Sequence, residues 1–232
     1  MARTSKTHAC MARVSAVAPP SRRDEREQED ILFALAEAVE QRDHHIAGHC
    51  QRLAYIAMTL GGAMGLERAE LLALYRGGYL HDVGKVGIPD SILFKPGRLT
   101  PEEWVVMRSH STRGEEICRH IRSMGEVLPI IRHHHEKWDG TGYPDGLRGE
   151  EIPLLARVLQ IADIYDALTS PRPYKPAYTA ADALRTIEEE SGSGWRDPVL
   201  VQLFLRIHPS VIAKMPAPDR SLHALQALAA RS

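Results

Sequence analysis

Apolar residues recur along the chain at the three- and four-residue spacing of an α-helix. Two early runs show the spacing: Ile31, Leu35 and Val39, then Leu53, Ala57 and Leu60. The alternation of apolar and polar residues that marks half-buried strands is hard to find anywhere. The pattern predicts an all-α fold.

Capping signals and turn-rich segments divide the predicted helices. Residues 100–103 (TPEE) form a capping box with proline at the first helical position, and Thr179 with Asp182 is a weaker version. Residues 85–99 and 138–153 carry repeated glycine and proline, which exclude a continuous helix. Because loops of this length in a compact helical domain are usually functional, we expect them to border a site.

Three segments are expected along the chain of 232 residues. Residues 1–28 are basic and lack periodicity, which favours a mobile arm without a catalytic role. Residues 29–215 are long enough for one packed helical domain, and residues 216–232 indicate a C-terminal helical tail.

Charge and cysteine content limit the classes of function. The formal net charge of -1 provides no overall field for a nucleic acid polymer or an anionic membrane. No apolar run is long enough to span a bilayer, and the scattered Cys10, Cys50 and Cys118 suit a reducing compartment better than a disulfide framework. These features favour a cytoplasmic protein, and Cys50 is expected to be a packed thiol.

Histidine is the unusual component, with 12 residues. His81-Asp82 ends an apolar helical run, but a two-residue motif alone is weak evidence for a metal. Further candidates lie in or beside other helical segments: His49, His110, His134, His135 and Asp163. Imidazole and carboxylate without thiolate suit iron, manganese or zinc. Seven such ligands would serve two ions, with Asp82 as the bridge, and two ions roughly 3.5 to 4 Å apart are the usual arrangement for hydrolysing a phosphoester.

Three longer segments carry a specific resemblance. They are "LHDVGKVGIPDSILFKPGRLT", "HHEKWDGTGYPDGLRGEEIP" and "ADIYDALTSPRPYK", and matching motifs extend from about Glu40 to Pro198. In order and spacing the chain resembles the HD-GYP family, a bacterial branch of the HD-domain metal phosphohydrolases. The resemblance implies an HD-domain helical bundle with long Gly/Pro-rich loops bordering a metal site. It also implies hydrolysis of the second messenger cyclic di-GMP to pGpG and often on to GMP.

The same resemblance assigns roles to individual residues. The matching metal positions are His49, His81, Asp82, His110, His134, His135 and Asp163. Two divalent ions are implied, with iron or manganese favoured. Lys85 matches a lysine placed against the substrate phosphate, and Arg172 and Lys175 match a phosphate-contacting pair. Gly142 and Tyr143 belong to the GYP loop that lines the ligand pocket.

One position departs from the family. Four residues before His49, members with three metals carry a glutamate and many others a tyrosine, whereas this chain has His45. An imidazole there would share a helix face with His49 and could hold a third ion, or it could face solvent. We expect His44 and His133 to lie outside the set of ligands.

Supporting roles are expected for residues near the motifs. We predict that Asp139 and Asp145 hold their loop through side-chain to backbone hydrogen bonds and that Glu136 orients a neighbouring histidine. Trp104 is predicted to be core, and Asp166 is predicted to be a salt-bridge partner rather than a ligand.

Alternatives remain open beside a cyclic di-GMP phosphodiesterase. One is a module that senses cyclic di-GMP, or docks onto a diguanylate cyclase through its GYP loop, with little turnover. Another is a hydrolase of a different nucleotide or of cyclic GMP-AMP, since phosphate and metal contacts would be shared. The sequence leaves the oligomeric state open.

Overall fold

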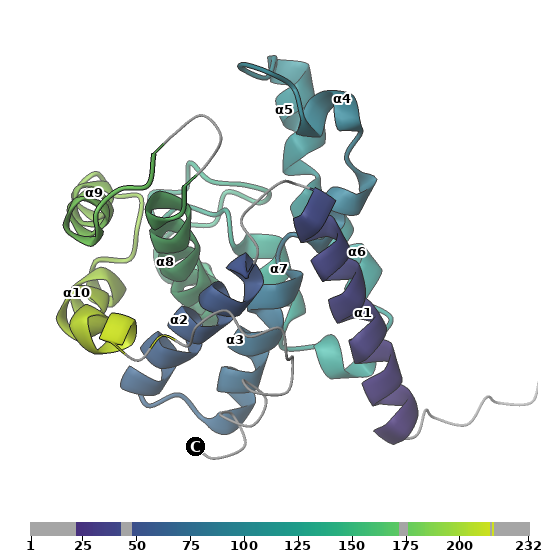
Figure 1. The fold of residues 1–232 in the computed structure, drawn as a ribbon, viewed down its shortest axis with the longest axis horizontal. Helices are drawn as coiled ribbons and strands as arrows, with labels where there is room; N and C mark the ends of the chain where they lie inside the picture. Colours follow the sequence, from purple (N-terminus) through teal and green to yellow (C-terminus); the bar gives the residue numbers. More distant parts are fainter. Residues whose placement is uncertain (1–21, 43–47, 172–175, 214, 216–232) are drawn as a thin grey trace, which may run out of the picture.

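The computed structural model describes residues 22–42, 48–171, 176–213 and 215. Within these ranges the chain forms ten α-helices, three short 3-10 helices and no strand, which confirms the all-α prediction (Figure 1). The α-helices are α1 (Arg22–Arg42), α2 (His49–Ala63), α3 (Arg68–Leu80), α4 (Asp90–Leu93), α5 (Pro101–Arg108), α6 (His110–Cys118), α7 (Leu128–His133), α8 (Leu154–Thr169), α9 (Ala180–Gly192) and α10 (Pro198–Ala213). The 3-10 helices are η1 (Val83–Gly87), η2 (Arg122–Met124) and η3 (Gly149–Glu151). None of the helices in the described part is long and apolar enough to cross a membrane.

The core lies between α2, α3 and α8. Helix α2 packs against both α3 and α8, and side chains such as Leu53, Leu74 and Leu159 are fully buried between them. Helices α9 and α10 cover one side of this centre, while α1 crosses the other (Figure 1). Burial of an apolar stripe on each helix gives the bundle its stability, at roughly 25 cal/mol per Å² of apolar surface removed from water.

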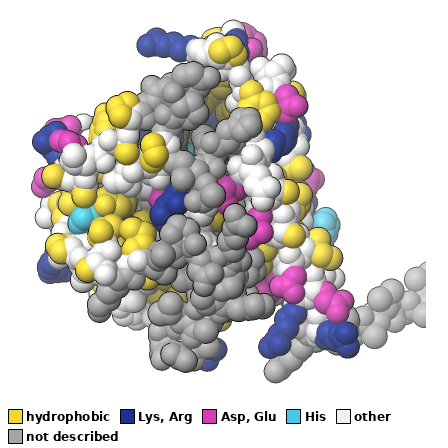
Figure 2. Space-filling view, in the orientation of Figure 1, with side chains coloured by type: hydrophobic (Ala, Val, Ile, Leu, Met, Phe, Trp, Pro, Cys, Tyr) yellow, Lys and Arg dark blue, Asp and Glu magenta, His cyan; other side chains and the backbone are white. Residues whose placement is uncertain are grey.

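Helix α1 begins at Arg22, inside the segment predicted to be an arm. Charged side chains surround its lower end (Figure 2), and Arg23 pairs with Glu27 one turn later at 3.2 Å. Pairs of opposite charge at this spacing stabilise exposed helical turns that carry no apolar residues, which explains why apolar periodicity misses the first turns of α1. Residues 1–21 and 216–232 lie outside the described residues, so the mobile arm and the C-terminal tail remain predictions.

Both predicted caps form. The Glu103 amide donates to Thr100 Oγ1 at 3.3 Å and the Thr100 amide donates to Glu103 Oε2 at 2.8 Å, while the Asp182 amide donates to Thr179 Oγ1 at 3.1 Å. The capping box begins α5, which projects with α4 away from the bundle (Figure 1).

Candidate metal centre

All seven predicted ligands come together at the ends or inner faces of helices. His49 begins α2, His81 caps the C-terminus of α3, His110 begins α6 and His134 caps the C-terminus of α7. Asp163 lies in the middle of α8. The residues form two groups with ligand atoms within 4.8 Å of one another: Asp82, His110, His134 and His135 in the first, and His49, His81 and Asp163 in the second.

Asp82 lies between the two groups. Its Oδ2 is 3.2 Å from His81 Nε2, while its Oδ1 is 3.3 Å from His110 Nε2 and 4.0 Å from His134 Nε2. One carboxylate therefore faces both groups, the geometry that the predicted bridging role requires.

Hydrogen bonds fix the tautomers of three of these imidazoles. The Nδ1 atoms of His81, His110 and His134 lie 3.1, 2.8 and 2.8 Å from the backbone carbonyl oxygen three residues earlier. A carbonyl oxygen only accepts, so each Nδ1 carries the proton and donates it. In the neutral imidazole each Nε2 then presents a lone pair to the cluster, as a metal ligand does.

Several polar atoms in the cluster lack a partner. His81 Nε2 and Asp82 Oδ1 are buried without a hydrogen bond, and the Nε2 atoms of His110 and His134 face each other at 3.4 Å. Converging lone pairs without donors are costly in a protein interior, and a cation between them would satisfy them. The donor set of imidazole and carboxylate suits iron, manganese or zinc. The residues present therefore fit a metal centre.

Burial keeps most of these imidazoles neutral. It lowers the pKa of His110, and together with the neighbouring histidines it lowers the pKa of His134 and His135 well below the ordinary value. For His81 burial acts in the same direction, but Asp82 outweighs it and the pKa is raised. Burial would raise the pKa of Asp82, but Lys85 and His81 hold it well below its usual range. The carboxylate is thus ionised and His110, His134 and His135 are unprotonated, the forms that bind cations.

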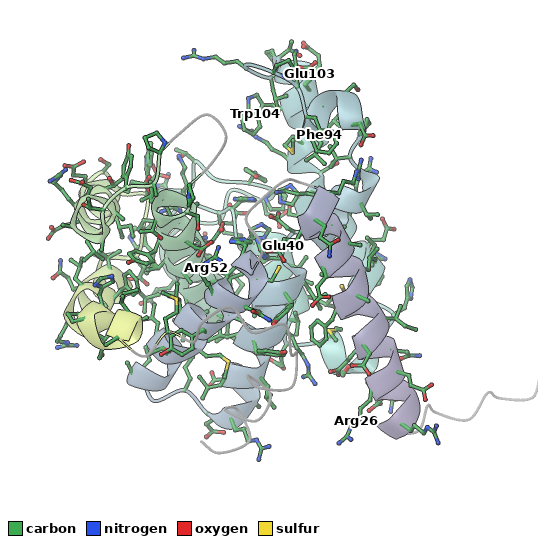
Figure 3. The ribbon with its side chains drawn as sticks, viewed as in Figure 1. Arg26, Glu40, Arg52, Phe94, Glu103 and Trp104 are labelled. Carbon is green, nitrogen blue, oxygen red and sulfur yellow. The ribbon has the colours of Figure 1, made fainter. Side chains whose placement is uncertain are left out.

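Asp166 positions the second group. His49 Nδ1 donates to Asp166 Oδ2 at 2.7 Å, which leaves His49 Nε2 facing Asp163 Oδ1 at 3.8 Å. Arg52 Nη2 also donates to the Asp166 carboxylate, at 3.1 Å, so the predicted salt-bridge role is confirmed. Across from Arg52, Glu40 of α1 accepts from the Cys50 amide at 3.3 Å and fixes the first turn of α2 (Figure 3). Cys50 is buried outside both groups, as predicted.

Lys85 lies beside the carboxylate of Asp82, with its Nζ 2.9 Å from Asp82 Oδ2. Arg42, in the last turn of α1, holds the backbone at this lysine and just after it. Its guanidinium donates to the carbonyl oxygens of Lys85 at 3.2 Å and Ile88 at 2.9 Å, and it pairs with Asp90. Sequence reasoning missed Arg42, because an arginine near a helix end has no pattern that distinguishes it.

The GYP loop forms a wall next to the first group. The Tyr143 ring stacks on the imidazole of His135, with centroids 4.7 Å apart and planes at 28°. Gly142 allows the close approach behind it, because a Cβ at this position would lie 2.2 Å from the Lys137 amide nitrogen. Fully buried Glu136 accepts from the amides of Asp145 at 2.8 Å and Gly146 at 3.1 Å.

Three supporting roles differ from the predictions. Glu136 holds the loop backbone instead of orienting a ligand, since the imidazole beside it, His133, is 3.7 Å away, beyond hydrogen-bond length. The Asp145 carboxylate pairs with Arg132 at 2.7 and 2.8 Å instead of with loop amides. Trp104 is 44% exposed, so the core prediction is wrong, because α5 projects from the bundle.

Other predicted roles have mixed outcomes. Asp139 accepts from the Thr141 amide at 2.9 Å, as predicted. His133 lies outside the two groups of predicted ligands, but with Glu136 and Asp145 it forms a third group whose ligand atoms lie within 4.8 Å of one another, and it contacts Asp145 at 3.5 Å. Four residues lie outside the described residues, so their roles remain predictions: His44, His45, Arg172 and Lys175.

Comparisons with known proteins identify the family. The HD domain family matches residues 34–200. The cyclic di-GMP phosphodiesterase response regulator RpfG of Xanthomonas campestris pv. campestris (strain 8004) is 41% identical over 187 residues, which cover 79% of this chain and 48% of RpfG. The 3'3'-cGAMP-specific phosphodiesterase 2 of Vibrio cholerae serotype O1 is 40% identical over 193 residues, which cover 82% of this chain and 37% of that protein.

A solved structure shares the fold. The crystal structure of the Vibrio cholerae cyclic GMP-AMP specific phosphodiesterase V-cGAP3 has a TM-score of 0.64 at 22% identity, covering 88% of this chain and 52% of that chain. The chain spans about half or less of the length of RpfG and of the cGAMP-specific enzyme it matches. It belongs to the HD domain family, and its motifs and relatives place it in the HD-GYP branch.

Proposed function

We propose that the chain is a metal-dependent phosphodiesterase that hydrolyses cyclic di-GMP to pGpG and on to GMP. The observation that carries the proposal is the carboxylate of Asp82 between two groups of ligand atoms, with unpartnered His81 Nε2 and Asp82 Oδ1 buried there. Relatives named cyclic di-GMP phosphodiesterases, including RpfG, support the choice of substrate.

Two divalent ions, iron or manganese, would be held by the seven ligand residues, with a third ion only if His45 binds one. When bound, such ions act as Lewis acids and lower the pKa of bound water, which supplies the nucleophile and balances phosphate charge.

The chain's own side chains bind and orient the substrate. The Lys85 ammonium lies 2.9 Å from the Asp82 carboxylate, next to the metal ligands. From there it can contact a phosphate oxygen of the substrate and donate a proton to the leaving 3′ oxygen. Tyr143 presents a ring face as a wall for the substrate. Arg172 and Lys175 add charge-assisted contacts to phosphate.

The names of some relatives make 3'3'-cGAMP a second candidate substrate. Relatives from Vibrio cholerae at 40% and 37% identity are named 3'3'-cGAMP-specific phosphodiesterases. A binding or docking module without turnover has less support, because all seven metal positions carry ligand residues.

The test combines metal analysis of anaerobically purified protein with product assays on cyclic di-GMP and 3'3'-cGAMP. We expect at least two ions per chain and formation of pGpG or GMP. Asp82→Ala should lose both metal and turnover, whereas Lys85→Ala should keep the metal and lose rate. Binding of cyclic di-GMP or of a diguanylate cyclase without turnover would favour the sensing or docking role. Turnover of 3'3'-cGAMP but not of cyclic di-GMP would make 3'3'-cGAMP the substrate. Full metal content and full activity in Asp82→Ala would refute the proposed metal centre.

A further inference from the structure

Three side chains form a row beside the metal centre, here called the aromatic row: Trp104, Arg108 and Tyr143. The Arg108 guanidinium carbon lies 5.7 Å from the Trp104 ring centre and 5.2 Å from the Tyr143 ring centre. Trp104 lies on α5, the helix that projects from the bundle (Figure 3). Arg108 follows it one helical turn later on the same helix. Cation–π contact orders the guanidinium without neutralising it.

The row leads outward from the ligands. Tyr143 stacks directly on His135, and Arg108 precedes His110 by two residues. Trp104 and Arg108 are both exposed. A phosphodiester held at the metal centre would therefore place the attached sugar and base toward Arg108 and Trp104, one ring farther out than Tyr143.

Arg108 is available for a ligand. No described residue forms an ion pair or hydrogen bond with its guanidinium, although other charges on this projection are paired, such as Glu103 with Lys95 at 2.6 Å. The indole of Trp104 is likewise exposed to solvent, although the sequence predicted that it would be buried in the core.

We propose that Trp104 and Arg108 bind a guanine base of the substrate and determine its specificity. The indole stacks on the base, as aromatic side chains do in sites that bind single-stranded bases. The planar guanidinium donates two parallel hydrogen bonds to guanine O6 and N7, whereas adenine presents an amino donor in place of O6. The inference rests on the proposed function, because it assumes a cyclic dinucleotide at the metal centre.

The test measures KM, kcat and calorimetric affinity for cyclic di-GMP and cyclic di-AMP, together with hydrolysis of bis(p-nitrophenyl) phosphate, which has no base. Arg108→Ala should raise KM for cyclic di-GMP roughly 5- to 150-fold, the range of a bidentate base contact, and reduce the preference over cyclic di-AMP. Metal content and hydrolysis of the baseless substrate should not change. Arg108→Lys should keep only part of this preference, because lysine keeps the charge but has no planar fork.

Trp104→Ala should weaken binding of both dinucleotides, and Trp104→Phe should restore much of it. Arg98→Ala is the matched control, an exposed arginine in the loop before α5, and should leave every value unchanged. An equal loss on the baseless substrate would assign Arg108 to the phosphate and overturn the inference, as would unchanged affinity in Arg108→Ala. If the wild-type protein binds cyclic dinucleotides without hydrolysing them, the proposed function fails while the affinities still test the base contact. If it binds none, both fail.

Discussion

Replacing Gly84 by alanine should separate two elements that carry the metal centre. Gly84 lies in η1, between Asp82 and Lys85, and packs against the start of α6, where His110 lies. A Cβ at this position would be 1.9 Å from the His110 carbonyl oxygen and 2.5 Å from the Gly114 amide nitrogen. Both clashes are with backbone, so no side-chain rotation can relieve them.

The size of the effect follows from these distances. Real Cβ atoms essentially never approach closer than 3.0 Å, so η1 and α6 must move apart by about 1 Å. Overpacking of this kind typically costs about 1–3 kcal/mol. For a protein of this size that corresponds to a fall in Tm of roughly 2–12 °C. A displacement of about 1 Å between catalytic groups can also lower the rate about 100-fold.

The assay compares thermal unfolding, metal content and turnover of Gly84→Ala with those of the wild type. Gly62→Ala is the matched control, because Gly62 is exposed in α2 and a Cβ there would meet nothing within 4 Å. The control should be as stable as the wild type or more stable, because alanine is favoured over glycine in a helix by up to about 1 kcal/mol. The reasoning is refuted if Gly84→Ala retains its metal, its rate and a Tm within 1 °C of the wild type.

Three further predictions use the same structure. Asp166→Asn should lower metal affinity about 10- to 100-fold in a chelator competition, because the partner that orients His49 is weakened; unchanged affinity would contradict this role. Arg42→Ala should lower kcat while metal content stays constant, because the backbone carbonyl of Lys85 loses its donor; a parallel loss of metal would point to general unfolding instead. In denaturant titrations the metal-free protein should lose stability as the pH falls below about 6.5, because the unfolded state binds more protons there than the folded state. The free energy of unfolding should fall by up to about 1.4 kcal/mol per pH unit for each histidine whose pKa is depressed by folding. The raised pKa of His81 changes the stability only above pH 6.5, where its contribution is lost as the pH rises. A free energy of unfolding that stays constant between pH 6.5 and 5 would contradict the presence of buried neutral histidines.

Sequence reasoning succeeded where a residue type has few physical uses. The histidines and aspartates are candidates by residue type and match the metal positions of the HD-GYP motifs, and the structure brings all seven together. The capping box at Thr100 follows equally from local chemistry.

Tertiary context decided the remaining assignments. Trp104 lies in a helix with apolar residues, but α5 projects from the bundle and no sequence pattern reports that. Glu136 and Asp145 lie beside ligands and glycines, yet their partners depend on how the loop returns to α7. Arg42 contacts residues more than 40 positions away, a separation that a single sequence cannot resolve.

The hydrogen bonds of Glu136 and Asp139 beneath the GYP loop affect the thermodynamics of binding. Two amides of the loop donate to the buried Glu136 carboxylate, and the Thr141 amide donates to Asp139. The loop is therefore ordered during folding, before any ligand arrives. Immobilising a flexible side chain on binding typically costs about 0.5–1.5 kcal/mol, and a wall already held by its own backbone contacts avoids much of this entropy loss. Association with different cyclic dinucleotides should then proceed at similar rates, and differences in affinity should arise from how fast each one dissociates.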